Sequence, residues 1–394
     1  MITYKEAQSQ INSLAKSFGT ETIELDDALG RVLAVPINAD RDYPPFNRCA
    51  MDGYAIRLKD FDAGLREFEI IEIIYAGQTF EKGLSAGECY KIMTGAAVPL
   101  SSDAVIRKED VEEKNKKVLV GDIRCSFFQN IAKQGQDILQ GVNIINPPYY
   151  CDAKTISLLA SLGKQRVIVE RLPKIAVFTT GNEVMPVDYP VSAVQIRNSN
   201  SYLIKSLLQQ KGIKPIICEH ILDEKADLSE AFNKALNFNI LIISGGVSAG
   251  DADFVPEVLE KLGVQKLFHK VSIKPGKPFW CGQLPNGGLV FALPGNPLSC
   301  LVTFSLFIEP FLRVSSGLKP QPIIKLPFNG TKTKNNSLDE FFPVIINEQK
   351  GLLEPVQING SGDIRLGLNA NAFGYHPAEI ETIKPNSLVE YYRL

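Results

Sequence analysis

The sequence is poor in the residues that build metal centres and membrane spans. Its three histidines, His220, His269 and His376, are too isolated for a histidine-rich metal centre. Its seven cysteines are never spaced Cys-x-x-Cys, which argues against a disulfide framework or zinc site and favours a reducing compartment. No apolar run approaches the ~18 residues that span a bilayer, and the N-terminus lacks a signal-peptide profile. We therefore expect a cytoplasmic protein.

The chain also lacks a strong charge of either sign. Its formal net charge is −2, with 42 Lys and Arg against 44 Asp and Glu. Proteins that bind nucleic acid or acidic membranes normally present a basic surface, so we expect neither partner. The composition is that of an ordinary globular protein, and 394 residues are enough for two to four domains of roughly 100–150 residues.

Hydrophobic periodicity divides the chain into four predicted domains. Residues 1–50, which open with helical spacing, and 138–170 are expected to form a discontinuous N-terminal domain. Short β-type runs punctuated by glycine predict a small β domain inserted over 51–137. Strand–helix alternation over 171–317 predicts a doubly wound, mostly parallel α/β domain. Residues 318–394 are expected to form a C-terminal β domain. The expected fold class is multidomain, α/β plus β.

The α/β segment carries regularly alternating signals. Expected strands are 175–178, 213–218, 240–243, 264–273 and 289–293. Expected helices are one capped near Asn198 or Ser199 and closed by Gly212, then 227–236, 254–262 and 297–314.

Four glycine-containing loops follow the expected strands. They are Thr180-Gly181-Asn182-Glu183, residues 244–253, Lys274-Pro275-Gly276-Lys277-Pro278 and Leu293-Pro294-Gly295-Asn296-Pro297. A lone Gly-Gly or Pro-Gly is more often only a turn. Ligands of open α/β sheets bind outside the carboxyl ends of the strands. Four such loops in one unit therefore favour a single crevice that holds a phosphorylated, anionic ligand.

Three of these loops suit an anion for a physical reason. Gly245 and Gly246 let backbone N–H groups approach an oxyanion closely. Asn296 is a good N-cap and Pro297 a good first helical residue, so the helix would present free N–H groups. The Pro-Gly turn of 274–277 would position two lysines as point charges.

The acidic candidates each have a structural alternative. For Glu183 a first-turn helix acid and a metal or acid/base role are about equally plausible. Capping explains at least one of Asp251 and Asp253, which precede a helix. Asp52, in Met51-Asp52-Gly53, and Asp137, after Gly135-Gln136, could each be only a turn residue. Carboxylates gathered near phosphates would suit Mg²⁺.

Taken together, these motifs resemble the molybdopterin molybdenumtransferase family, which completes molybdenum cofactor. The matching motifs run through most of the chain: Pro44-Pro45-Phe46, Ala50-Met51-Asp52-Gly53-Tyr54-Ala55, Ile92-Met93-Thr94-Gly95-Ala96, Gly135-Gln136-Asp137-Ile138 and the four loops above.

The resemblance implies four subdomains per chain, a molybdopterin-binding α/β fold and an elongated homodimer. The active cleft would lie between the α/β domain of one subunit and the N-terminal domains of the other. The implied reaction takes adenylylated molybdopterin and molybdate and gives molybdenum cofactor and AMP, aided by Mg²⁺. Transient partners would be the upstream adenylyltransferase and molybdoenzymes.

From the residues and the resemblance together, we expect Asp52, Asp137 and Glu183 to be catalytic, with Asp137 and Glu183 also binding the metal. The expected substrate-binding residues are Thr94, Asp223, Ser244, Gly245, Gly246, Ser248, Asp251, Asp253, Lys270, Lys274, Lys277, Pro294, Gly295, Asn296, Pro297 and Ser299. Of these, Lys274, Lys277 and Ser299 fall where the family is thought to hold molybdate.

The sequence departs from the family pattern at three places. Ala132-Lys133-Gln134 replaces the usual arginines before Gly135, Asn182 stands where aspartate is common, and Asp339-Glu340-Phe341-Phe342-Pro343 lacks flanking arginines. Arginine clamps oxyanions in a bidentate way that lysine does not. Either affinity is lower, or Lys133, Arg107 or Arg365 compensates.

Two other functions stay open. A molybdopterin-binding scaffold or carrier without turnover would account for the missing arginines. A nucleotide pyrophosphatase on the same α/β domain would leave the Pro-Pro-Phe and Met-Asp-Gly segments unexplained.

Overall fold

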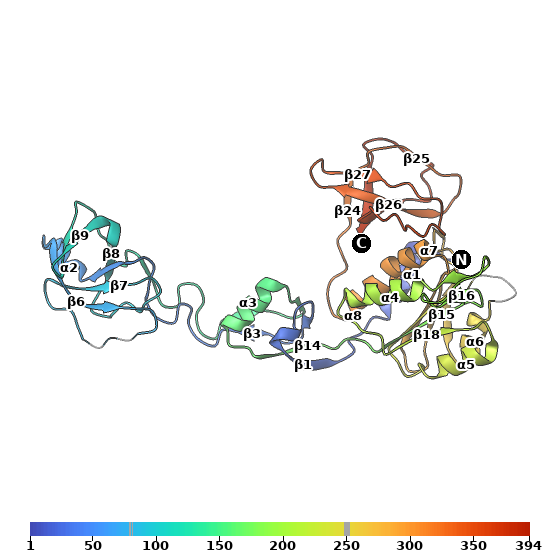
Figure 1. Ribbon diagram of the computed structural model, residues 1–394, viewed down its shortest axis with the longest axis horizontal. Coiled ribbons are helices and arrows are strands. Elements are labelled where there is room, and N and C mark those ends of the chain that lie inside the picture. Colours follow the sequence, from blue (N-terminus) through green and yellow to red (C-terminus); the bar gives the residue numbers. More distant parts are fainter. Residues whose placement is uncertain (79, 81, 248–252) are drawn as a thin grey trace. The chain divides into compact units, whose positions relative to one another are not determined.

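The computed structural model describes residues 1–394 except 79, 81 and 248–252 (Figure 1). The chain divides into two compact units. The first unit comprises Met1–Ala34, Pro148–Ile156 and Arg166–Leu394, and the second comprises Val35–Pro147 and Ser157–Gln165. Separate sheets in the two units confirm the multidomain α/β plus β class. The finer boundaries of the four domains stay a prediction.

A six-stranded sheet forms the centre of the first unit. Its first four strands are parallel, as strand–helix alternation predicted. Its last two strands are antiparallel, and the sequence pattern did not predict β22. In spatial order the strands are β18 (Ile217–Ile221), β15 (Ile175–Thr180), β19 (Ile240–Ser244), β23 (Leu289–Leu293), β22 (Trp280–Gln283) and β20 (Gln265–His269).

Helices cover both faces of this sheet. Ile175 and Val177 of β15 pack into one core, and the alternating Ala176 and Phe178 pack into the other. The first core includes α4 (Asn200–Gln209) and α7 (Pro297–Thr303), and the second includes α5 (Lys225–Asn233) and α6 (Val255–Lys261). The doubly wound arrangement is therefore confirmed, because side chains alternate between faces along each strand.

The predicted helix over 297–314 is continuous but irregular. It consists of α7, the π-helical segment η3 (Phe304–Ile308) and α8 (Glu309–Ser315). Pro310 cannot donate a backbone hydrogen bond to the preceding turn, which accounts for the irregular segment. Contrary to our expectation from apolar runs, Pro297–Ser315 is long and apolar enough to cross a membrane. However, 72% of this window is buried inside the fold, as in a core helix.

The N-terminal helix α1 (Tyr4–Ser13) packs into the first core, as its spacing predicted. It begins at a capping box between Thr3 and Glu6, and its buried side chains are Tyr4, Ala7 and Ile11. The same unit contains a four-stranded antiparallel sheet of β1 (Thr20–Glu24), β14 (Arg166–Glu170), β2 (Val32–Leu33) and β13 (Tyr149–Tyr150). Short elements here are η1 (Leu25–Asp27), β16 (Val184–Met185) and β17 (Ile196–Arg197).

The C-terminal strands form a sheet with its own core around Phe328, Phe342 and Val344. One of its edge strands, β21 (Ile273–Lys274), comes from the α/β segment and places Lys274 opposite Glu340. The other strands are β26 (Asp339–Asn347), β28 (Ala372–His376), β30 (Leu388–Arg393), β24 (Ile324–Pro327) and β27 (Leu352–Pro355), with β25 (Lys332–Thr333) paired to β29 (Thr382–Ile383).

The second unit is built on another six-stranded sheet, in agreement with the short β-type runs of this region. In spatial order the strands are β8 (Ala104–Arg107), β5 (Gly53–Ile56), β7 (Glu88–Ile92), β6 (Glu67–Ile74), β10 (Lys117–Val120) and β9 (Val111–Lys114). Smaller elements are β3 (Ile37–Asn38), β4 (Arg48–Cys49), α2 (Leu58–Asp62), η2 (Lys108–Asp110), β11 (Ile131–Ala132) and β12 (Asn143–Ile145), while α3 (Ala153–Ser161) runs from the first unit into the second.

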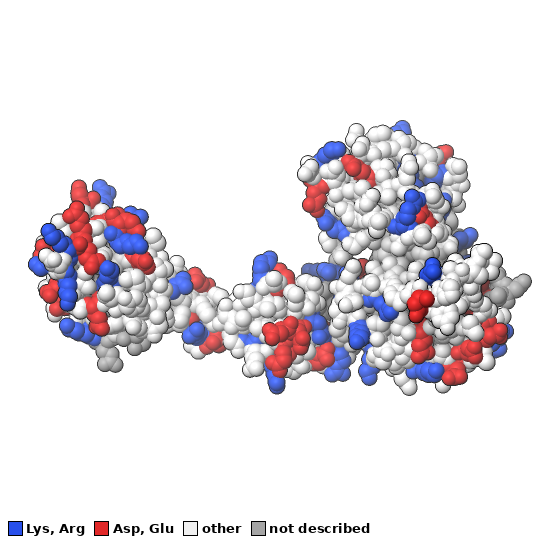
Figure 2. Space-filling view, viewed as in Figure 1, with Lys and Arg blue, Asp and Glu red and all other residues white. Residues whose placement is uncertain are grey.

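Basic and acidic side chains are interspersed over the face shown in Figure 2. This mixed surface agrees with the near-neutral formal charge of the chain.

Candidate functional site

The carboxyl ends of the parallel strands bring three of the four predicted loops together. The strand register pairs Thr179 of β15 with Ser244 of β19, and Ser244 with Leu293 of β23. The loops after these strands therefore begin at the same edge of the sheet. A Cβ added at Gly295 would lie 3.9 Å from Cα of Gly245, so two of the loops are in contact.

The two glycines after β19 lie against the end of β15. A Cβ at Gly245 would lie 2.6 Å from the carbonyl oxygen of Thr180, and one at Gly246 would lie 3.0 Å from Thr180 Oγ1. Both glycines also have positive φ, +106° and +64°. Our expectation that both N–H groups are free for an anion is wrong for Gly245, whose N–H donates to Leu293 O at 3.1 Å. Glycine is needed at position 245 because the neighbouring strands approach each other closely there.

A chain of hydrogen bonds holds the loop after β15. Asn198 Nδ2 donates to Thr179 Oγ1 at 2.7 Å, and this hydroxyl lies 3.2 Å from His220 Nδ1. His220 Nε2 lies 3.1 Å from the carbonyl oxygen of Gly181. Because a carbonyl only accepts, Nε2 carries the proton and Nδ1 accepts from Thr179. Of the two cap residues that the sequence indicated, Ser199 occupies the N-cap position of α4, while Asn198 Oδ1 accepts from Ser201 N at 3.1 Å.

Asn200 joins two of the converging loops. Its Nδ2 donates to Ser244 Oγ at 2.9 Å and to the carbonyl oxygen of Gly295 at 2.8 Å. Ser244 Oγ in turn donates to Pro294 O at 3.3 Å. Sequence reasoning placed Ser244, Pro294 and Gly295 in the site but missed Asn200, whose only signal was its position at a helix start. Among the described residues Asn200 Oδ1 is buried without a hydrogen-bond partner, so one acceptor remains unused.

Three carboxylates influence one another at these strand ends. Burial raises the pKa of Asp223; the Thr180 hydroxyl opposes this shift, and the charges of Glu183 and Asp253 add to it. The Asp223 backbone N–H donates to Asn182 Oδ1 at 3.0 Å. Asp223 Oδ1 and Thr180 Oγ1 are buried without a hydrogen bond of normal geometry within the described part of the chain. Buried oxygens that lack a hydrogen bond and lie beside negative charges are consistent with a site that binds a cation.

The carboxylates do not form a complete metal site by themselves. Outside residues 79, 81 and 248–252, no group of three His, Cys, Asp or Glu side chains is arranged to hold a metal ion. Mg²⁺ often takes only one or two carboxylates, together with waters and substrate phosphates. The residues present therefore fit an ion that binds with a phosphorylated substrate. The expected metal pair, Glu183 and Asp137, belongs to separate units and stays a prediction.

The predicted lysines lie on a loop that is linked to the glycine loop. The backbone N–H groups of Lys270 and Val271 donate to Phe279 O at 2.9 Å and Lys277 O at 3.0 Å, which closes the loop. His269 Nε2 lies 3.1 Å from Val247 O and connects it to the segment after β19. Lys274 and Lys277 are exposed. This arrangement leaves two exposed ammonium groups on a loop closed by backbone hydrogen bonds.

The helix start after Gly295 differs from the expected free N-terminus. Asn296 does not cap α7 with its side chain; instead Nδ2 donates to Ser361 Oγ at 3.0 Å. The Leu298 N–H donates to the Ser361 carbonyl oxygen at 3.3 Å. The C-terminal domain therefore occupies donors that we expected to face an anion. Pro297 is half-buried and Ser299 is buried.

The second unit positions Asp52 and Thr94 as partners. Asp52 Oδ1 accepts from Thr94 N at 2.8 Å and from Thr94 Oγ1 at 2.7 Å. These bonds, the backbone one first, lower the pKa of Asp52, and Lys108 at 3.6 Å adds to the shift. A Cβ at Gly53 would lie 2.0 Å from Ile106 O, so only glycine fits after Asp52. These contacts favour the ionised form of Asp52, which directly precedes β5 where that strand packs closely against β8.

The remaining predicted residues are placed as follows. Asp137 is exposed in the second unit, and Ser248 and Asp251 lie outside the described residues. Arg107 and Arg365 each pair in a bidentate way with a local carboxylate, Asp110 or Asp363, and compensation for the missing arginines stays a prediction. Lys133 Nζ lies 4.6 Å from the centre of the Phe128 ring.

Comparison with known proteins agrees with this arrangement. Residues 2–163 match the family described as the MoeA N-terminal region (domain I and II), and residues 176–314 match a probable molybdopterin binding domain. The molybdopterin molybdenumtransferase of Bacillus subtilis is 33% identical over 388 residues, which cover 94% of this chain and 89% of the relative. That of Staphylococcus epidermidis is 33% identical, with 99% and 94% covered.

A solved structure extends the likeness to the whole fold. The crystal structure of a molybdopterin biosynthesis moea protein from Pyrococcus horikosii superposes with a TM-score of 0.83 at 31% identity, covering 100% of this chain and 99% of that one. The chain therefore belongs to the molybdopterin molybdenumtransferase family, a family of transferases in molybdenum cofactor biosynthesis.

Proposed function

We propose that this protein inserts molybdenum into adenylylated molybdopterin, with molybdate as the metal source and AMP as the released product. The name of the relatives supports molybdenum transfer to molybdopterin. The single observation that carries the finer proposal is the convergence of three strand-end loops around the carboxylates of Glu183, Asp223 and Asp253. Together with a divalent cation held by these carboxylates, the loops would suit a phosphoanhydride better than a neutral ligand.

The proposed chemistry brings two anions together. A molybdate oxygen attacks a phosphorus of the anhydride, and the bond from that phosphorus to the AMP oxygen breaks. The repulsion between the reactants must be offset by nearby cations and N–H dipoles. Lys274 and Lys277 are exposed on the loop that His269 connects to the segment after β19, so they are the side chains proposed to bind molybdate.

Mg²⁺ is part of the proposal, and its proposed ligands include Glu183 and Asp137. When bound it would neutralise the pyrophosphate and polarise the bond that breaks. The neighbouring carboxylates support this role, because burial and the charges of Glu183 and Asp253 raise the pKa of Asp223, and a divalent cation would relieve the repulsion. Asp52, held ionised by Thr94, is the proposed catalytic carboxylate of the second unit.

A cytoplasmic homodimer completes the proposal, with transient contacts to the upstream adenylyltransferase and to molybdoenzymes. Measuring the molar mass in solution by light scattering tests the dimer directly. A monomer at all protein concentrations would contradict it.

The function is tested by AMP release from adenylylated molybdopterin and Mg²⁺, with and without molybdate. We expect release that depends on both molybdate and Mg²⁺. Tight binding of the substrate without release would instead show a scaffold or carrier. Molybdate-independent cleavage, extending to simple dinucleotides, would show a pyrophosphatase.

A further inference from the structure

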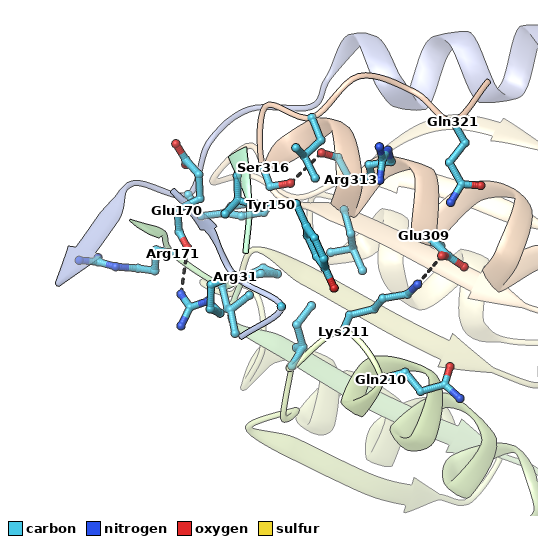
Figure 3. Close-up of a pocket in the computed structure, with 18 residues that line it drawn as sticks. Arg31, Tyr150, Glu170, Arg171, Gln210, Lys211, Glu309, Arg313, Ser316 and Gln321 are labelled. Carbon is cyan, nitrogen blue, oxygen red and sulfur yellow. Dashed lines mark hydrogen bonds and ion pairs between the residues drawn. The ribbon is translucent and has the colours of Figure 1, made fainter. Parts of the chain in front are cut away.

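Polar side chains at the two ends of the parallel strands of the first unit have different partners. At the amino ends, before β15 and β18, lies a cavity of about 250 Å³ (Figure 3). Its four cationic side chains are each bound to an acceptor of the protein itself: Arg31 to Glu21, Arg171 to the Thr20 carbonyl oxygen, Lys211 to Glu309 and Arg313 to the Lys319 carbonyl oxygen. These bonds hold neighbouring chain segments together.

At the carboxyl ends, His220 of the edge strand β18 contacts the loop that carries Glu183. The strand register places His220 beside Thr179 of β15. Its Nδ1 lies 3.2 Å from Thr179 Oγ1, and its Nε2 lies 3.1 Å from the Gly181 carbonyl oxygen. The imidazole therefore links the end of β15 to the residues that follow it. No sequence motif indicated this histidine.

Hydrogen bonds around the ring determine which nitrogen of His220 carries the proton. Asn198 Oδ1 accepts from the Ser201 backbone N–H at 3.1 Å, so Nδ2 is the amide atom that donates to Thr179 Oγ1, at 2.7 Å. The Gly181 carbonyl oxygen only accepts, so His220 donates to it through Nε2–H. Nδ1 then accepts from the Thr179 hydroxyl. A neutral imidazole protonated on Nε2 satisfies all of these contacts.

The Gly181 peptide supports the Glu183 carboxylate. A Cβ at Gly181 would lie 3.0 Å from Glu183 Oε2 and 3.1 Å from Oε1, so the carboxylate lies directly against this glycine. The Gly181 carbonyl oxygen also accepts from the Val184 N–H at 3.2 Å, which closes a turn around Glu183. The bond from His220 to this carbonyl therefore acts on the carboxylate through the backbone of the turn.

The end of β18 also holds a second carboxylate beside Glu183. Asp223 follows His220 by three residues, and its backbone N–H donates to Asn182 Oδ1 at 3.0 Å. Burial raises the pKa of Asp223 and the charge of Glu183 adds to this shift, so the two carboxylates interact. Because Gly181 and Asn182 are both bound to the end of β18, this strand end sets the separation of the two carboxylates.

We propose that His220 is a positioning residue for the Glu183 carboxylate, which it holds at the separation from Asp223 that a shared divalent cation needs. His220 acts through the Gly181 carbonyl and is not itself a proposed ligand of the cation. Groups that orient a metal ligand through hydrogen bonds commonly affect metal affinity in this way. The inference rests on the proposed function, in which Glu183 binds Mg²⁺ together with a phosphorylated substrate.

The probe for this role is Mn²⁺ in place of Mg²⁺, titrated into the full-length protein and followed by electron paramagnetic resonance. We expect saturable binding that Glu183→Gln weakens. His220→Ala should weaken it by roughly tenfold. His220→Gln, which supplies an amide N–H for the Gly181 carbonyl, should restore most of the affinity. Cys218→Ala, an exposed change on the same face of β18, is the matched control and should leave binding unchanged.

A double-mutant cycle separates positioning from a general structural role. If His220 acts through Glu183, His220→Ala should change Mn²⁺ binding by less than about twofold in a Glu183→Gln background. Equal loss in both backgrounds, or no loss in either, would overturn the inference. Should His220→Ala fail to fold, as its melting temperature would show, His220→Leu fills the same space without a donor and takes its place in the cycle.

The same titrations distinguish failure of the inference from failure of the proposed function. No saturable Mn²⁺ binding by the unchanged protein, or binding that Glu183→Gln leaves intact, would overturn the proposed metal role and the inference with it. Binding that depends on Glu183 but not on His220 would overturn the inference alone.

Discussion

Asn200 and Ser244 are joined by a hydrogen bond of 2.9 Å between the side-chain amide of a helix start and the hydroxyl at the end of a central strand. The same amide nitrogen donates to the carbonyl oxygen of Gly295 at 2.8 Å. One side chain thereby sets the separation between the loops after β19 and β23. Since both loops belong to the proposed substrate site, Asn200 is a positioning residue for it.

Replacing Asn200 by alanine should lower AMP release by about tenfold or more, because the two loops lose their shared donor. Steady-state kinetics should show the loss in kcat/KM, with the far-UV spectrum unchanged. Asn233→Ala, at an exposed position at the end of α5, is the matched control. Equal activity of the two variants would contradict a positioning role for Asn200.

Glu183→Gln should spare folding but reduce molybdate-dependent AMP release on the order of a hundredfold, because it removes a metal-binding or acid/base charge. The variant should also need more Mg²⁺ for half-maximal rate. Glu219→Gln, an exposed change on the edge strand β18, should leave both quantities unchanged. Near-normal turnover of Glu183→Gln would rule out the proposed role.

Asp223→Asn should stabilise the fold at neutral pH while lowering activity. Burial and neighbouring charges raise the pKa of Asp223, so its ionised form destabilises the folded state at pH values above that pKa. This destabilisation disappears below the pKa that an aspartate has in the unfolded chain, about 4. The melting-temperature advantage of the variant should therefore shrink as pH falls. An advantage that is independent of pH, or shared by the exposed Asp227→Asn, would contradict this.

Thr94→Val should shift the acid limb of the pH–activity profile to higher pH. The Thr94 N–H and hydroxyl lower the pKa of Asp52, and the variant keeps the first bond but loses the second. Asp52 then protonates at a higher pH, and activity falls earlier on acidification. Thr22→Val, on the exposed side of β1, is the control. If the acid limb lies at the same pH in Thr94→Val as in the unchanged protein, Asp52 does not take part in the reaction.

Gly245→Ala should lower the free energy of unfolding by about 1–3 kcal/mol, as overpacking commonly does. The added Cβ would lie 2.6 Å from the Thr180 carbonyl oxygen at a φ of +106°. Chemical denaturation should reveal the loss. Gly83→Ala, where the nearest atom would be 4.0 Å away, should change stability little. Similar stability of both variants would contradict the close packing described here.

The α/β architecture was predictable because its signals are local. Ile175–Thr180 and Leu289–Leu293 are continuous apolar strands, and helical spacing marked α4 to α6 between strands. The missed strand β22 pairs antiparallel with β23 and with the edge strand β20, and no helix separates it from β23. Alternation of strands and helices indicates parallel strands that are connected through a helix, so it does not predict an antiparallel strand such as β22.

The candidate site was predictable only in outline. Glycine loops after strands indicated where chain segments converge, because strands of a parallel sheet end at one edge. Three facts depend on segments far apart in the chain: the Gly245 N–H donates to the Leu293 carbonyl oxygen, Ser361 occupies donors at the start of α7, and Asn200 joins two loops.

The sequence by itself determined the family, the order of elements and the residue types at the strand ends, because spacing and composition are properties of neighbouring residues. Only the tertiary structure decided which donors remain available and which carboxylates interact electrostatically. Hydrogen-bond partners and burial are set by contacts between segments far apart in the chain, as the bond from Leu298 to Ser361 shows.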